Sequence, residues 1–122
     1  MYIVDLKDHV GSFPQVELPC EEGLVDIRDY RISSVDLGDD LEIRLVSDSG
    51  RIILRFIEAR LLEDGGTSAE AAASTWLLSI SRPDAWDIRT REDILAFSLD
   101  YAVVEGWVVQ CREAQAIIQP RI

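Results

Sequence analysis

Apolar and polar residues alternate most regularly between residues 24 and 62. Apolar side chains take every second position from Leu41 to Leu45 with charged residues between them, which predicts a strand with one buried face. A turn at residues 48–50 precedes the segment 51–62, where apolar residues in both alternations predict one long interior strand. The alternation in residues 30–37 changes phase across its two central serines, and a β-bulge would restore the register. We therefore expect a three-stranded antiparallel meander.

The chain before the meander gives weaker signals. Residues 2–6 alternate as a short strand, whereas the Gly and Pro residues that follow predict a long connection over residues 7–23. This connection is either pinned to the core by Phe13, Val16 and Leu18 or serves as a recognition surface.

The chain after the meander predicts further strands. Residues 75–81 form one, with Trp76, Leu78 and Ile80 expected on its buried face. Beyond Gly106, alternating residues predict two more strands, with Trp107 and Cys111 in the core. The ranges of these two strands are residues 107–112 and 114–119.

One short helix is expected near residues 68–74. Residues 67–70 (Thr-Ser-Ala-Glu) have the form of a capping box, and three alanines that favour helix follow them. Residues 91–103 fit either a helix or a strand, and we favour the strand because Ser98 and Asp100 fit a period of two.

These elements predict a mainly β protein. We expect an antiparallel meander or sandwich-like sheet of about seven strands with one short helix, folded as a single domain over residues 1–122. The alternative is an α+β fold in which residues 91–103 form a helix on one face of the sheet.

The charge of the chain narrows the classes of partner. Twelve Lys and Arg against 23 Asp and Glu give a net charge of −11, and residues 1–64 carry most of the excess. A surplus of acids argues against nucleic-acid binding, because phosphate neutralisation requires clustered basic residues. The chain begins without the pattern of a signal peptide and has no apolar run long enough for a membrane span. We therefore expect a cytoplasmic protein that does not bind membranes.

No catalytic or cofactor motif stands out. Cys20 and Cys111 are expected to be reduced, and with a single histidine, His9, the chain offers no zinc-ligand pattern. His9 beside Asp8 is expected to be a surface residue, because no nucleophile accompanies it. We therefore expect neither a metal nor a cofactor, and a protein that is not an enzyme.

An acidic cluster around one turn is the candidate site. It could form an anionic surface for a basic protein or a solvated strand face, and its spacing does not match a calcium-binding loop. Trp86, flanked by acidic residues between two elements, is a candidate aromatic anchor. The acidic candidates are Asp36, Asp39, Asp40, Glu42 and Asp48.

The stretch from Ile32 to Asp64 carries a resemblance. It contains an acidic turn, a strand with one solvent-exposed face and an apolar strand with a charged end. In this respect the chain resembles small acidic bacterial immunity proteins of polymorphic and contact-dependent toxin systems. The resemblance implies a protein that binds one cognate toxin and blocks its active or membrane-entry surface. It transfers no individual binding residue to this chain.

The sequence leaves three functions open. The first is an immunity protein or other inhibitor whose acidic face binds a basic toxin or enzyme. The second is a β-rich assembly module, monomeric or homodimeric, with residues 94–101 or 114–119 as an open sheet edge. The third is a small enzyme or ligand-binding domain with a pocket between sheet and helix.

Overall fold

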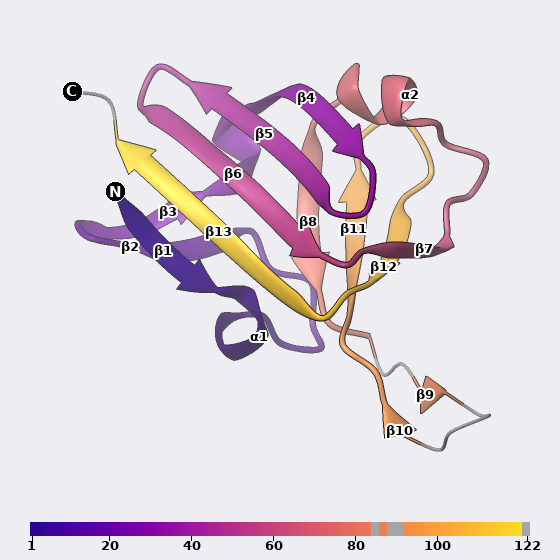
Figure 1. Cartoon of the computed structure of the whole chain (residues 1–122). Coiled ribbons are helices and arrows are strands. Elements are labelled where there is room, and N and C mark those ends of the chain that lie inside the picture. The colour runs from indigo at the N-terminus through magenta and orange to yellow at the C-terminus, as the bar shows by residue number, and fades with distance from the viewer. Residues whose placement is uncertain (84–85, 88–91, 121–122) are drawn as a thin grey trace.

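The computed structural model describes residues 1–83, 86–87 and 92–120, and it gives residues 86–87 and 92–93 as strand backbone (Figure 1). Its largest element is a five-stranded antiparallel sheet with the strand order β1-β13-β6-β5-β4. The strands of this sheet are β1 (Tyr2–Asp5), β4 (Arg31–Leu37), β5 (Leu41–Ser47), β6 (Gly50–Ile57) and β13 (Glu113–Pro120).

A four-stranded antiparallel sheet with the order β7-β12-β11-β8 lies behind the first (Figure 1). Its strands are β7 (Arg60–Glu63), β8 (Leu77–Ser81), β11 (Ala96–Tyr101) and β12 (Trp107–Gln110). The remaining described strands form two two-stranded antiparallel sheets: the hairpin of β2 (Glu17–Cys20) with β3 (Gly23–Asp26), and the pair of β9 (Trp86–Asp87) with β10 (Glu92–Asp93). The helices are α1 (Leu6–His9), the 3-10 turn η1 (Ile27–Asp29) and α2 (Ala69–Ala73).

The hydrophobic core lies between the two larger sheets. Alternate residues of β5, β6 and β13 are buried, as the period of two requires when one face of a sheet is covered. Phe56 from the five-stranded sheet meets Phe97 from the other sheet edge to face, with ring centroids 5.6 Å apart. Buried Trp107 donates a hydrogen bond from Nε1 to the carbonyl of Thr67 at 3.1 Å. The fold is thus mainly β and sandwich-like, as the sequence predicts.

The meander forms as expected, and so does the strand favoured within residues 91–103. Strands β4, β5 and β6 pair in sequence order, and the register shifts between Ile32 and Ser34, at the predicted bulge. Gly50 follows the turn between β5 and β6 with a φ of 146°, a conformation that favours glycine. Within residues 91–103 the described core is the strand β11, paired on both sides, so the helical alternative is wrong.

The long strand predicted over residues 51–62 is two strands. β6 ends at Ile57, and β7 joins the other sheet by pairing with β12. Glu58 lies at the corner with a φ of 52°, which non-glycine residues adopt rarely, and its N–H donates to Asp40 Oδ1 at 2.9 Å. Alternation continues through such a corner, because each strand buries its own inner face, so the pattern does not reveal it.

The predicted connection over residues 7–23 contains regular structure. Asp5 accepts a hydrogen bond from the N–H of Lys7 and begins α1, and the β2–β3 hairpin follows. Leu18 is fully buried and pins this hairpin to the core, whereas Phe13 is 83% exposed. Pro19 is compatible with a strand here because the hairpin pairs on one side only.

Two local predictions need correction near the second sheet. The helix α2 has Ser68 as its N-cap, accepting from the N–H of Ala71, so the cap lies one residue later than the predicted capping box. Leu77 and Ile80 face the core, whereas Trp76 and Leu78 are 48% and 40% exposed, because β8 has a bulge at Leu78 that puts residues three apart on one face.

Neither predicted open edge is an edge. β11 lies between β8 and β12, and β13 lies between β1 and β6. Their backbone hydrogen-bonding groups are therefore occupied on both sides, which removes the reason for assigning self-assembly to these strands.

Candidate functional site

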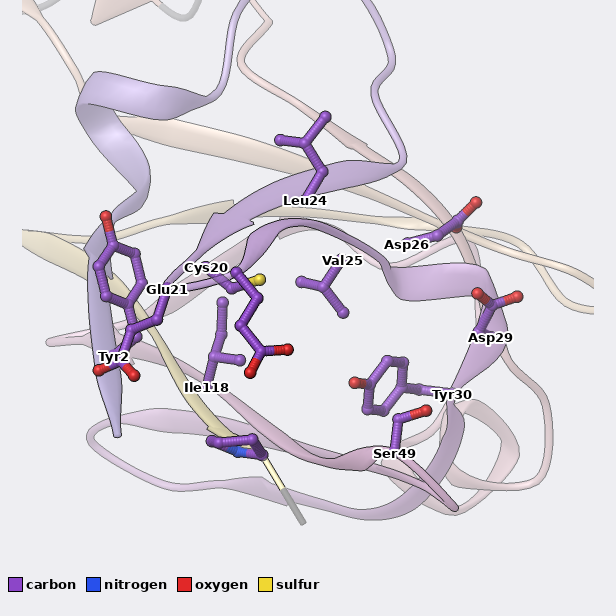
Figure 2. Close-up of a pocket in the computed structure, with 12 residues that line it drawn as sticks. Tyr2, Cys20, Glu21, Leu24, Val25, Asp26, Asp29, Tyr30, Ser49 and Ile118 are labelled. Carbon is purple, nitrogen blue, oxygen red and sulfur yellow. The ribbon is translucent and has the colours of Figure 1, made fainter. Parts of the chain in front are cut away.

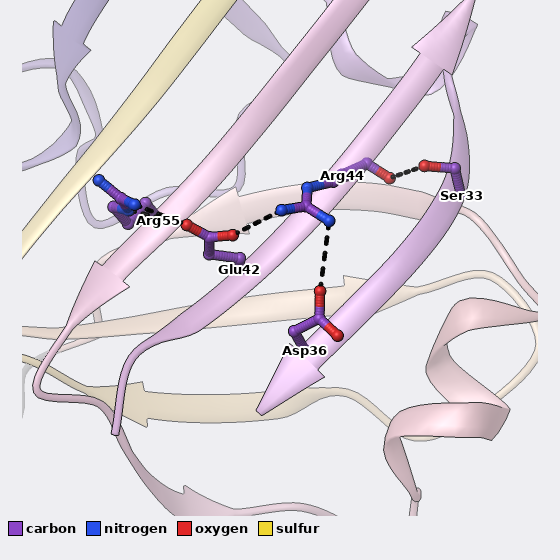
Figure 3. A network of polar contacts seen from close by, with 5 residues as sticks. All are labelled: Ser33, Asp36, Glu42, Arg44 and Arg55. Carbon is purple, nitrogen blue, oxygen red and sulfur yellow. Dashed lines mark hydrogen bonds and ion pairs between the residues drawn. The ribbon is translucent and has the colours of Figure 1, made fainter. Parts of the chain in front are cut away.

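Two of the predicted acidic residues form an ion-pair network on the outer face of the five-stranded sheet (Figure 3). The register puts Asp36 opposite Glu42 and Glu42 opposite Arg55, so their side chains share this face. Glu42 contacts Arg55 at 2.9 Å through Oε1 and Arg44 at 3.0 Å through Oε2. Arg44 also reaches Asp36 at 3.5 Å. Two arginines thus neutralise the two carboxylates.

Asp39 and Asp40 accept hydrogen bonds from the backbone at the corner that follows β6. The carbonyl of Asp39 accepts from the N–H of Ala59 at 2.8 Å, and Asp40 Oδ1 accepts from the N–H of Glu58. These contacts fix the β4–β5 turn against the chain as it passes from one sheet to the other. Asp40 therefore has a structural role that its place in an acidic run does not indicate.

The remaining predicted residues lie apart from this group. Asp48 is exposed in the β5–β6 turn, at the opposite end of β5 from Asp39 and Asp40. Trp86 belongs to the small strand β9, and its side chain is outside the described part of the structure. The six predicted residues are consequently not gathered into one site.

A cavity of about 340 Å³ lies between the β2–β3 hairpin and the end of the five-stranded sheet (Figure 2). Its walls come from β1, the β2–β3 hairpin, the segment around η1, the β5–β6 turn and the end of β13. The residues that line it are Tyr2, Cys20, Glu21, Glu22, Leu24, Val25, Asp26, Asp29, Tyr30, Ser49, Ile118 and Pro120.

The floor of the cavity is apolar. Ile118 is on the inner face of β13, and Val25 packs against the core from the hairpin (Figure 2). Leu24, two-thirds exposed, stands at the rim. Gly23 closes the hairpin with a φ of 130°, which places Leu24 and Val25 directly after the turn.

The rim of the cavity is acidic. Glu21 and Glu22 occupy the hairpin turn and are exposed, as is Asp29 in η1. Asp26 is paired with Arg28 at 2.7 Å, and the hydrogen bond from Arg28 lowers the pKa of this carboxyl below its ordinary value. Among the described residues that line the cavity, none is Lys, Arg or His.

Tyr30 supplies a polar group to the same cavity. The residue is only 5% exposed, and its ring packs in the core cluster. Figure 2 shows its hydroxyl pointing into the cavity, and within the described residues that hydroxyl has no hydrogen-bond partner. The ring is buried while the hydroxyl oxygen is open to the cavity, so this group is available to a ligand.

The other ionisable candidates have ordinary surroundings. Both cysteines are free thiols, and burial raises the pKa of the Cys111 thiol to about 12, whereas Cys20 is half-buried at the cavity. His9 is exposed and its Nδ1 lies 2.9 Å from the carbonyl oxygen of Asp5. The described side chains include no group of three His, Cys, Asp or Glu residues placed to hold a metal ion. Among the described helices, none has the length and apolarity needed to cross a bilayer.

Sequence reasoning did not find the cavity. Glu21 and Glu22 lie in a segment whose Pro and Gly residues predict an irregular connection, and Asp26 and Asp29 lie just beyond it. These acids meet Tyr2, Ser49 and Ile118 only through long-range pairing. The available signal was the local density of acids between Glu17 and Asp29, with Arg28 as the one base. Comparison of the chain with protein-family models, with curated proteins and with solved structures finds no match.

Proposed function

We propose that this chain is a protein-binding protein that recognises a basic partner, and that it acts as a bacterial immunity protein by neutralising a cognate toxin. The observation that carries the proposal is the cavity beside the β2–β3 hairpin, whose ionisable side chains include carboxylates and no base within the described lining. The chain as a whole has a net charge of −11, which is of the same sign as the charge at this cavity.

The distribution of charge favours the hairpin as the contact surface. On the outer face of the five-stranded sheet, Arg44 and Arg55 already compensate Glu42 and Asp36. At the cavity, Glu21, Glu22 and Asp29 keep their negative charges exposed to solvent. Such a field attracts a positively charged protein, accelerates its association and disfavours acidic competitors.

Inhibition requires binding and no chemical step. A basic enzyme such as a nuclease keeps its positive charge around the channel that admits its substrate, and an acidic protein seated there excludes that substrate. The proposal places the protein in the cytoplasm, as a monomer or homodimer, where it meets the toxin without a cofactor.

The test begins with affinity capture on the immobilised chain from lysate of the organism that encodes it, with stepwise elution in salt. A captured protein is then purified and its association rate with the chain is measured at several ionic strengths. The proposal expects a basic protein whose association slows steeply with salt and whose toxic activity is blocked by an equimolar amount of the chain. A neutral or acidic partner, or a partner whose activity persists in the complex, would contradict it.

A further inference from the structure

The geometry points to an arginine side chain of the basic partner as the occupant of the cavity beside the β2–β3 hairpin. This inference rests on the proposed function and adds to it the part of the partner that is recognised. We propose that the aliphatic part of that arginine lies over Val25 and Ile118, and that its guanidinium group meets Tyr30 and the carboxylates of the rim.

The size and walls of the cavity fit one long side chain. A volume of about 340 Å³ is at the lower end of the range for ligand pockets, which is small for a nucleotide or a flavin. The apolar floor of Val25 and Ile118 suits methylene groups, while the acidic rim suits a cationic end group. Long basic side chains combine these two chemistries, because they bury an aliphatic stem beneath a charged head.

The polar groups favour arginine over lysine. A guanidinium group presents five N–H donors in a planar fork, so it can serve several acceptors that lie in different directions. Glu21, Glu22 and Asp29 supply carboxylate acceptors, and the Tyr30 hydroxyl supplies a further one that is unpartnered within the described residues. Tyr2 and Tyr30 also offer aromatic rings at the wall, on which a guanidinium group stacks favourably.

Arginine–carboxylate pairs already occur elsewhere in this chain. On the outer sheet face, Arg55 binds Glu42, and at the hairpin Arg28 binds Asp26. A second cavity, near the β5–β6 turn, is lined by Arg51 and by no carboxylate in the described residues. The cavity at the hairpin thus differs from its surroundings: Asp26 is paired with Arg28, but Glu21, Glu22 and Asp29 have no ion-pair partner among the described residues.

The first arm of the test uses a defined probe and needs no partner. N-acetyl-arginine-N-methylamide is titrated into the labelled full chain and followed by 1H–15N NMR, with the neutral citrulline analogue as the control. We expect shifts centred on Val25 and Tyr30, with a dissociation constant on the order of millimolar, and no saturable shift with citrulline. Shifts spread over the whole acidic surface, or equal binding of citrulline, would overturn the inference.

Variants distinguish an effect of the cavity residues from an effect of the net charge of the chain. Tyr30→Phe keeps the ring in place and is expected to weaken arginine binding about fivefold while leaving the thermal midpoint unchanged. The combined change Glu21→Gln, Glu22→Gln and Asp29→Asn is expected to weaken it about tenfold. A matched triple variant removes the same charge from three exposed residues that do not line the cavity: Glu63→Gln, Glu70→Gln and Glu113→Gln. Equal losses in the two triple variants would overturn the assignment.

A second arm uses the captured partner. Tyr30→Phe and the cavity triple variant are expected to slow association or hasten dissociation of the complex, and the matched triple variant is expected to do so by much less. If the partner binds all variants alike, the arginine inference is wrong while the proposed function stands. If the arginine probe fills the cavity but spermidine binds more than about tenfold tighter, the cavity is a small-cation site and the inference is likewise wrong.

Discussion

The two acidic regions of this protein have opposite electrostatic character. On the outer face of the five-stranded sheet, Glu42 uses both carboxylate oxygens on arginines, Arg44 of its own strand and Arg55 of the neighbouring strand. At the β2–β3 hairpin, Glu21, Glu22 and Asp29 surround a cavity whose described lining contains no base. Both regions are rich in acids in the sequence, yet the first is close to neutral and the second is strongly negative.

The difference follows from how each region is built. Strands β4, β5 and β6 place side chains at fixed cross-strand positions, and arginines occupy the positions beside the acids. The hairpin consists of two strands that pair only with each other. Glu21 and Glu22 lie in its turn, where no third strand of the described structure places a basic side chain beside them. A sheet face thus tends to neutralise its charges, whereas a turn at the edge of the fold leaves them for a partner.

The largest expected effect concerns the packing that holds the hairpin. Leu18→Ala removes a fully buried side chain and is expected to lower the free energy of unfolding by about 2–5 kcal/mol, through lost burial and the cavity left behind. Leu24→Ala, in the same hairpin but two-thirds exposed, is expected to cost less than about 0.5 kcal/mol. Chemical denaturation of both variants measures the difference, and equal costs would show that the hairpin is not anchored to the core by Leu18.

The next effect concerns the ion pairs of the outer sheet face. Glu42→Ala leaves Arg44 and Arg55 without their shared carboxylate and is expected to destabilise the fold by about 1 kcal/mol. Asp36→Ala is the matched control, with an expected cost near zero, because its side chain is two-thirds exposed and its contact with Arg44 is 3.5 Å long. Urea denaturation at low and high salt checks both values. A loss at Asp36 as large as that at Glu42 would contradict the described network.

A smaller effect of opposite sign is expected at the cavity. The combined change Glu21→Gln, Glu22→Gln and Asp29→Asn relieves repulsion among like charges and is expected to raise stability by up to about 0.5 kcal/mol at low salt. The gain should disappear at high salt, where exposed charges are screened. Differential scanning calorimetry at two salt concentrations measures it, and a clear destabilisation would mean that these acids have structural partners.

The smallest expected effect is the pH dependence of the Asp26–Arg28 pair. The hydrogen bond from Arg28 lowers the pKa of Asp26 in the folded state, so the folded state binds this proton less tightly than the unfolded chain does. The stabilisation is therefore present above the unfolded pKa near 3.8 and is lost as the pH falls through the lowered folded pKa. Asp26→Asn should show a shallower loss of stability between neutral and acidic pH. An unchanged pH profile would contradict this contribution.

The sequence predicts the meander because its signals are local. The alternation over Leu41–Leu45, the bulge at Ser33 and Ser34 and the turn before Gly50 each lie within a few residues, and all three form as predicted. The corner at Glu58 escapes prediction because alternation survives a change of sheet. The exposure of Trp76 escapes prediction because a bulge within β8, at Leu78, decides which residues of this strand turn inward.

The site is less predictable than the fold for the same physical reason. Acids can be counted in a sequence, but whether Glu42 is neutralised depends on Arg55, a residue of another strand in the proper register. The hydroxyl of Tyr30 can contribute to a binding site only because the fold brings Tyr30 and Ile118, which are distant in the chain, into the lining of one cavity. Such information arises when the strands pair and has no counterpart in the local pattern.

The most direct test of the central claim is the reaction of Cys20 with methanethiosulfonate reagents of opposite charge. Cys20 lines the cavity, and buried Cys111, with its raised pKa, remains unreacted near pH 8, so peptide mapping assigns the modification. Both reagents attack the same thiolate, so the ratio of their rates reports the local potential. We predict that the trimethylammonium reagent reacts at least about tenfold faster than the sulfonate reagent, and that the ratio falls towards one in the Glu21→Gln, Glu22→Gln and Asp29→Asn variant. A ratio near one in the unaltered chain, or one unaffected by these substitutions, would contradict an acidic cavity open to a cationic side chain.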